Sequence, residues 1–246
     1  MRADSGDGLP VSTARIESWH PCTPHVGPAK SLQSSDWEVP TESNQTIVTA
    51  DGRGLGEIIR QIFVLAGQKY EDVRYSFEEW PKHKDEMPFG QIPVLEVDGK
   101  QLGQSFAIVR FLSRKFGFAG KSPFEEALVD SIADQYKDYF NEIYPFIRVA
   151  LGFEQGDLKL TREVFLPTRE KFFGFMTKFL KKSTSGYLIG DSLTFVDLYL
   201  AEHTSEMVKK VPTLYDGFPE IKAHAEKIRS IPALKEWINT RPVTNF

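Results

Sequence analysis

The sequence predicts an α/β domain that is followed by an all-helical domain. In the first half, a short apolar strand, a tight turn and a second strand lie between two segments whose apolar residues have helical spacing. Beyond a Lys-Ser-Pro linker at 121–123, the apolar residues recur with helical spacing throughout. A chain of 246 residues is long enough to form two modest hydrophobic cores.

Residues 1–45 differ from the rest of the chain in composition. This segment holds five of the fifteen prolines, is rich in Ser, Thr, Asp and Gly, and lacks a sustained apolar period. Such a composition favours a disordered or loosely attached tail. We therefore predict a tail at 1–45, an α/β domain at 46–121 and an all-α domain at 122–246.

The α/β domain begins with a β-α-β unit. Residues 47–48 predict a brief strand, and the glycine-rich turn at 51–54 leads into an amphipathic helix that ends at Gly67. Residues 73–77 alternate between apolar and polar side chains, which is typical of a second strand.

A hairpin and a helix complete this domain. Pro93 lacks an N–H, so it can only open a strand, and we expect its peptide bond to be cis. Asp98 and Gly99 suit the positive φ angles of a type I′ turn. Ser105 then begins a helix whose tip offers free N–H groups to a carboxylate. The element order is that of a thioredoxin-like domain, and the parts together predict a receptor for a small acidic peptide.

The second domain contains several helical patterns. Apolar residues trace one long amphipathic helix over 128–143 and another over 172–180. Thr194 and Asp197 form a capping box that opens an apolar helix. The segment 230–242 predicts a last short helix that is stopped by proline.

Composition and charge exclude several classes of function. The net charge of −4 and the pI near 5.8 give no basic footprint for nucleic acid. No apolar run approaches the roughly 18 residues of a membrane span, and residues 1–8 lack the apolar core of a signal peptide. Cys22 is the single cysteine, which excludes an internal disulfide, a Cys-x-x-Cys redox pair and a cysteine-based zinc site. We expect a cytoplasmic protein without nucleic-acid or membrane partners.

The chain resembles a glutathione transferase of the sigma class, of the nematode type. The resemblance covers about residues 50–246 and rests on separated motifs that occur in family order and at family spacing. It implies a thioredoxin-like domain plus a helical domain, and conjugation of glutathione to electrophilic apolar compounds in detoxification. Glutathione would be the co-substrate, with no tightly bound cofactor. The motifs are Gly-Glu-Ile-Ile-Arg at 56–60, Tyr70-Glu71-Asp72, Trp80, Gln91-Ile92-Pro93, Gln104-Ser105, the Thr194 capping box, and the run from Ile231-Pro232 to Arg241-Pro242.

The resemblance implies how the γ-glutamyl end of glutathione would be held. Gln104 and Ser105 would bind this end, with the helix tip facing its carboxylate. Asp138 matches an acid that reaches across a homodimer to the γ-glutamyl amine. Some sigma-class members bind a divalent ion near this acid, but Lys137 occupies one of those positions, so no metal is predicted. The plain alternatives are a simple helix cap at 104–105 and an exposed helix acid at Asp138.

The rest of the tripeptide would lie along the hairpin and the segment before it. The backbone of Ile92, ahead of Pro93, would pair with the cysteinyl unit, and Gln91 lies beside it. Trp80 and Lys84 would bind the glycyl carboxylate through an indole N–H and an ammonium. The alternatives are a packing role for Trp80 and a solvated loop charge for Lys84.

The chain departs from the family at the catalytic residue. Members carry a tyrosine near the end of the first strand, in a run like Tyr-Phe-Asn-Gly-Arg-Gly. Counting back from the Gly-Arg-Gly at 52–54 puts Thr49 at the tyrosine and Ala50 at the phenylalanine. Conjugation needs the thiolate, but a thiol with a pKa near 8.5 is only about 3% ionised at pH 7. A phenol that donates a hydrogen bond to the sulfur would lower this pKa, and this chain lacks that phenol. Thr49 is either the replacement donor or an ordinary strand residue.

The acceptor would lie in a cleft between the domains, to which Tyr144 and Phe146 contribute. Two other functions stay open. One is a catalytically impaired protein that binds glutathione or hydrophobic ligands, which the loss of the tyrosine favours. The other is a glutathione-dependent prostaglandin isomerase. A thiol-disulfide oxidoreductase is disfavoured, because the usual cysteine position of the fold is empty.

Overall fold

A computed structural model of the chain describes residues 44–244. The predicted tail therefore lies outside the described residues, except for its last two positions. Gln45 already belongs to the first strand, which is longer than the brief strand that the sequence predicted. Within the described residues, no helix is long and apolar enough to cross a membrane.

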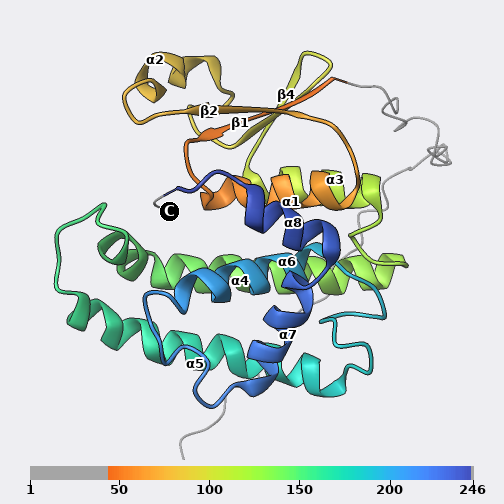
Figure 1. Ribbon diagram of the computed structural model, residues 1–246, viewed down its shortest axis with the longest axis vertical. Coiled ribbons are helices and arrows are strands. Elements are labelled where there is room, and N and C mark those ends of the chain that lie inside the picture. The colour runs from red at the N-terminus through yellow and green to blue at the C-terminus, as the bar shows by residue number, and fades with distance from the viewer. Residues whose placement is uncertain (1–43, 245–246) are drawn as a thin grey trace, which may run out of the picture. The chain divides into compact units, whose positions relative to one another are not determined.

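A four-stranded sheet with the order β2-β1-β3-β4 forms the first layer (Figure 1). β1 (Gln45–Ala50) pairs in parallel with β2 (Glu71–Tyr75) and antiparallel with β3 (Val94–Val97). β3 continues through the turn into β4 (Lys100–Gly103). The predicted β-α-β and β-β-α order is confirmed, although Phe77 lies beyond the end of β2.

Helices cover both faces of this sheet. Ile47 and Leu95 point into a fully buried core with α1 and α3, while Val48 and Val94 face the other way, toward Trp80 at the start of α2. The strand period of two explains this division, because neighbouring residues point to opposite faces. The helices are α1 (Glu57–Leu65), α2 (Trp80–His83) and α3 (Ser105–Phe116), with short 3-10 turns at Gly54–Gly56 and Lys84–Glu86.

The second half of the described chain is helical, as predicted. The two long predicted helices are confirmed, and each continues past an internal proline, Pro145 in the first and Pro167 in the second. The capping box is also confirmed, because both of its reciprocal bonds between Thr194 and Asp197 are present. The helices are α4 (Pro123–Ala150), α5 (Leu158–Lys182), α6 (Phe195–Met207), α7 (Pro219–Arg229) and α8 (Pro232–Thr240).

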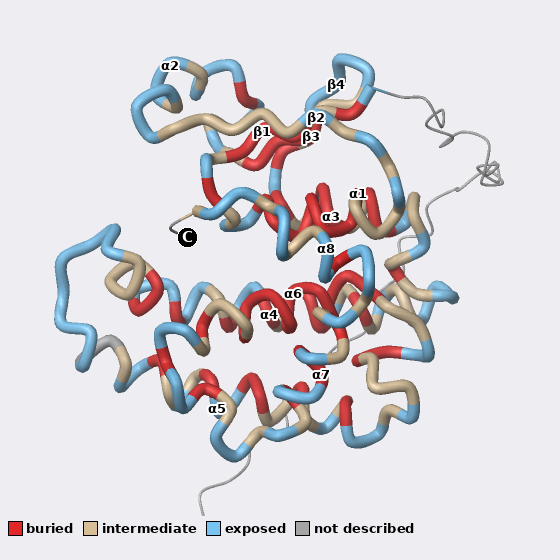
Figure 2. Tube along the Cα trace, viewed as in Figure 1, coloured by how far each residue is buried: buried red, intermediate tan, exposed pale blue. Residues whose placement is uncertain are grey.

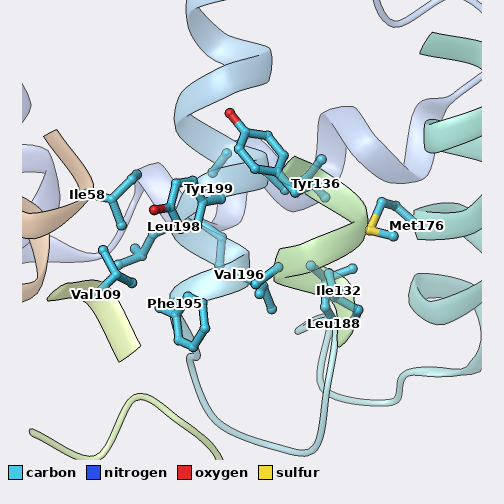
Figure 3. Close-up of a cluster of buried hydrophobic side chains, with 14 of the residues drawn as sticks. Ile58, Val109, Ile132, Tyr136, Met176, Leu188, Phe195, Val196, Leu198 and Tyr199 are labelled. Carbon is cyan, nitrogen blue, oxygen red and sulfur yellow. The ribbon is translucent and has the colours of Figure 1, made fainter. Parts of the chain in front are cut away.

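One hydrophobic cluster joins the sheet layer to the helices of the second half. Buried residues lie along α1, α3, α4 and α6 in Figure 2, and α6 lies at the centre of this arrangement. Figure 3 shows Ile58 and Val109 on one side of α6, and Ile132, Tyr136 and Met176 on the other. The sequence suggested one core for each domain, whereas the described residues share a continuous core.

Candidate functional site

The hairpin has the backbone geometry that the sequence predicted. The Ile92–Pro93 peptide bond is cis. Asp98 and Gly99 have φ angles of 49° and 78°, which are the positive values that a type I′ turn requires. β3 begins one residue after Pro93, so the backbone of Ile92 lies just outside the ladder that β1 and β3 form.

The start of α3 lies beside the approach to this hairpin. Gln104 Nε2 donates to Gln91 Oε1 at 3.3 Å, so the two predicted glutamines are brought together. Gln104 has φ 71° and ψ 111°, a conformation that a residue with a side chain rarely adopts. Such strain persists where the surrounding structure imposes it, often at ligand sites. Ser105 follows as the first residue of α3 and is buried.

The start of α2 and the turn that follows it lie on the other side of the hairpin approach. Trp80 is half-buried and packs against the cluster of Val48, Met87 and Val94. The Lys84 methylenes lie close to Gly90, because a Cβ placed on Gly90 would be 3.4 Å from Lys84 Cε. Gly90 also has a φ of 57°, which favours glycine. Lys84 therefore lies next to the segment that leads into Gln91 and Ile92.

Thr49 is enclosed at the end of β1. Its side chain faces α1, and its residue is only 3% exposed. Thr49 Oγ1 accepts a hydrogen bond of 2.5 Å from Arg60 Nη2, and Arg60 is itself fully buried. A Cβ on Gly56 would lie 2.7 Å from Thr49 Cγ2, so the 3-10 turn before α1 approaches this strand too closely for a residue larger than glycine. The hydroxyl still carries one proton that it can donate.

Asp138 lies on the exposed side of α4. Its neighbour Lys137 places Nζ 5.9 Å from the centroid of the Phe106 ring, and Phe106 follows Ser105 at the start of α3. This part of α4 is thus close to the start of α3 within one chain. Among the described residues, no group of three or more His, Cys, Asp or Glu side chains is arranged to hold a metal ion.

A cavity of about 260 Å³ opens where β1 and β2 end. Sequence reasoning did not identify it, although a signal was present. Parallel strands bring their carboxyl ends to the same edge of a sheet, so the residues that follow β1 and β2 were candidates for one site. Val243 and Thr244 of the C-terminal segment contribute to the edge of the cavity, where Val243 is exposed. The cavity is lined by Ala50, Asp51, Tyr75, Ser76, Phe77, Val243 and Thr244.

Ser76 and Glu79 hold the rim of this cavity. The Ser76 N–H donates to Glu79 Oε2 at 3.0 Å, and the Glu79 N–H donates to Ser76 Oγ at 3.2 Å. These reciprocal bonds lower the pKa of the Glu79 carboxyl, mainly through the Ser76 backbone N–H. They also fix the turn between β2 and α2. Phe77 extends from this turn, and its ring meets that of Phe153 at 6.0 Å between centroids.

The two aromatic residues that the sequence suggested for the acceptor site have different environments. Phe146 is 2% exposed and stacks on Phe165 with 4.5 Å between ring centroids. It therefore belongs to the core between α4 and α5, and its assignment to an open pocket was wrong. Tyr144 is 45% exposed and lies under the guanidinium of Arg148, outside the lining of the cavity. The helical spacing of apolar residues could not distinguish these two environments.

Comparisons with known proteins point to one family. Family models described as the N-terminal and C-terminal domains of glutathione S-transferase match residues 50–114 and 130–241. The chain is 56% identical over 195 residues to the probable glutathione S-transferase 8 of Caenorhabditis elegans, covering 79% of this chain and 95% of that protein.

Solved structures give the same result. Monomeric Na-GST-3, a glutathione S-transferase from the hookworm Necator americanus, is 74% identical with a TM-score of 0.81. The match covers 82% of this chain and 100% of that one. A Nu-class enzyme of the same kind from Haemonchus contortus is 63% identical with a TM-score of 0.76, covering 83% and 100% of the two chains.

Proposed function

The chain belongs to the glutathione S-transferase family, and on this premise we propose that it binds glutathione on its sheet layer and joins the glutathione sulfur to electrophilic apolar compounds. The single observation that carries this proposal is the meeting of the Gln104–Ser105 helix tip with Gln91 and the segment that ends at Pro93. A detoxifying role would follow from this chemistry.

The placement of glutathione follows from the groups around that meeting point. The γ-glutamyl carboxylate faces the Ser105 hydroxyl and the free N–H groups of the first turn of α3, where the helix dipole favours an anion. The cysteinyl unit pairs with the backbone of Ile92 in the manner of an added strand. At the other end, the Lys84 ammonium and the Trp80 indole N–H bind the glycyl carboxylate.

The acceptor binds in the cavity at the ends of β1 and β2. Its lining residues combine the apolar Phe77, Val243 and Ala50 with the polar Asp51 and Ser76. Apolar walls with a few polar groups are typical of small-molecule sites. The cavity begins one residue after Thr49, which occupies the position that a family member uses to activate the sulfur.

A second function, glutathione binding without turnover, is favoured by the surroundings of Thr49. The Thr49 hydroxyl is buried and already accepts a bond from the charged Arg60 guanidinium. The Thr49 hydroxyl would have to donate to the sulfur from beneath the loop that follows β1. A phenol at this position would reach further and is more acidic than an aliphatic hydroxyl.

The experiment that tests these functions is a titration of the purified chain with glutathione, in which heat and thiolate absorbance are recorded together. Heat with thiolate formation, and turnover of 1-chloro-2,4-dinitrobenzene, are expected for a transferase. Heat without either signal supports the binding protein. The absence of heat contradicts both functions.

A Thr49→Tyr variant, with Thr49→Ser as the control, separates the two functions further. Lowering the thiol pKa by about two units would raise the thiolate from about 3% to roughly three quarters at pH 7. We expect Thr49→Tyr to increase turnover by about an order of magnitude or more. An equal increase in the serine variant would show that the phenol is not the cause.

A further inference from the structure

The cavity at the ends of β1 and β2 has a first wall that contains Asp51 and a second wall that contains Val243. We propose that Glu206 on α6 is a positioning residue that fixes the separation of these two walls and thereby sets which acceptors fit. Glu206 does not line the cavity. The link to acceptor choice rests on the proposed function, because it requires this cavity to be the acceptor site. The connection between Glu206 and the two walls does not depend on the proposed function.

One carboxylate connects the two walls. Glu206 Oε2 lies 3.2 Å from Arg53 Nη2, and Arg53 is two residues after Asp51 in the first wall. Glu206 Oε1 lies 3.5 Å from Arg241 Nη2, and Arg241 is two residues before Val243 in the second wall. Arg53 and Arg241, which are 188 positions apart in the chain, therefore bind the same side chain.

The burial of these groups distinguishes the link from an ordinary surface ion pair. The side chains of Arg53 and Glu206 are 20% and 22% exposed, and that of Arg241 is 7% exposed. Pairs in such surroundings are screened by water and salt much less than exposed ones. Lys209 also bonds Glu206, at 2.8 Å, but it is largely exposed and lies on neither wall.

The two arginines depend on Glu206 to different degrees. Arg241 also donates to Glu57 at 2.5 Å and to Glu202 at 2.9 Å, so its end of the link is held by a cluster of carboxylates. In the described part of the chain, Arg53 forms its ion pair with Glu206. The Arg53 Nε is buried and has no acceptor among the described residues. Loss of Glu206 would therefore loosen mainly the wall that contains Asp51.

The expected loosening is partial. Arg60 Nη1 donates to the Gly52 carbonyl at 3.0 Å, so the backbone after β1 keeps a second attachment when Glu206 is removed. We therefore expect a wider range of wall separations rather than an open or unfolded site. An acceptor that fills the cavity should lose affinity, while glutathione, which contacts the hairpin and α3, should not.

The first test needs no ligand. Spin labels are attached to cysteines that replace the exposed Asp51 and Val243 in a Cys22→Ser background, and the distance distribution between them is measured. We expect Glu206→Gln to broaden it. The control is Glu226→Gln, which removes an exposed carboxylate whose ion pair with Lys222 is long, at 3.9 Å. An unchanged distribution in Glu206→Gln would overturn the proposal.

The second test compares the affinities of glutathione and S-hexylglutathione, whose alkyl chain enters the cavity. Glu206→Gln should reduce the affinity gain from the hexyl group about threefold to fivefold, which is below about 1 kcal/mol, and leave glutathione affinity unchanged. Equal losses for both ligands would indicate a general structural defect and contradict the proposal. If the wild-type chain binds neither ligand, the proposed function fails, and the distance measurement still decides the role of Glu206.

A second variant tests the same ion pair in case Glu206→Gln does not fold. Arg53→Gln removes the other end of the same ion pair and leaves Glu206 bound to Arg241 and Lys209. It should broaden the distance distribution as Glu206→Gln does. A narrow distribution in this folded variant would also refute the link.

Discussion

Lys84 shows how one exposed side chain can be assigned a role from its neighbours. Its stem lies against Gly90, and the side chain is exposed next to the hairpin approach. Hydrogen bonds to charged groups contribute about 1.5–3 kcal/mol, and exposure places Lys84 at the low end. We expect Lys84→Met to weaken glutathione binding about tenfold in calorimetry. Lys82→Met, an exposed lysine two residues earlier, is the control, and equal affinity in both variants would remove Lys84 from the site.

His203 is a second residue whose environment makes a measurable prediction. Burial lowers its pKa to about 3, and its Nε2 lies 2.9 Å from the Tyr139 hydroxyl. Because the pKa in the folded state is below the unfolded value of about 6.5, the neutral form is favoured by folding. The corresponding stability is complete above pH 6.5 and is lost as the pH falls toward 3.

This dependence can be measured by urea unfolding at a series of pH values. His203 should contribute a loss of up to about 1.4 kcal/mol per pH unit below pH 6.5. His203→Gln keeps a hydrogen-bonding group but does not titrate, so its free energy of unfolding should fall less steeply. Parallel curves for wild type and His203→Gln would contradict the prediction.

At the level of single elements, α6 illustrates how a local motif acquires a wider role. Asp197 closes the capping box at Thr194, and its carboxylate also accepts from the Leu188 N–H at 2.8 Å and contacts His224 Nε2 at 2.9 Å. The side chain is completely buried. One acid thus anchors the start of the central helix, the preceding loop and α7.

Removal of this acid should be costly. A helix cap contributes about 1 kcal/mol, and a buried network that loses one member costs about 3–5 kcal/mol. We expect Asp197→Ala to lower the free energy of unfolding by roughly 3 kcal/mol or more in denaturant titration. Asp191→Ala, at an exposed ion pair with Lys121, should change it by less than about 1 kcal/mol. Similar values for the two variants would show that Asp197 acts only as a cap.

At the scale of the whole molecule, the prediction concerns assembly. The resemblance to sigma-class enzymes implies a homodimer in which Asp138 completes the partner's site, whereas the similar Na-GST-3 of Necator americanus is monomeric. If the dimer forms, Asp138→Asn should weaken glutathione binding about fivefold, and dilution to monomer should do the same. Sedimentation and calorimetry at matched concentrations measure both. Glu142→Gln, an exposed acid one turn further along α4, is the control. A monomer with full affinity would exclude this role.

Much of the architecture followed from the residues in order, because it depends on neighbours within a few positions. The turn at Asp98–Gly99, the cis bond before Pro93, the capping box at Thr194 and the helical periods are of this kind, and all are present in the structure. Family motifs assigned Gln91, Gln104 and Ser105 to one ligand, and the structure brings Gln91 and Gln104 within hydrogen-bond distance.

Long-range packing set the remaining features, and no local pattern encodes them. The burial of Thr49 under Arg60 depends on how closely α1 approaches β1. Phe146 and Tyr144 share a helical repeat, yet one packs against α5 and the other faces solvent. The cavity and its link through Glu206 join segments from opposite ends of the described chain. Such contacts exist only after the sheet and helices have packed, because the free energy that holds them comes from the shared core.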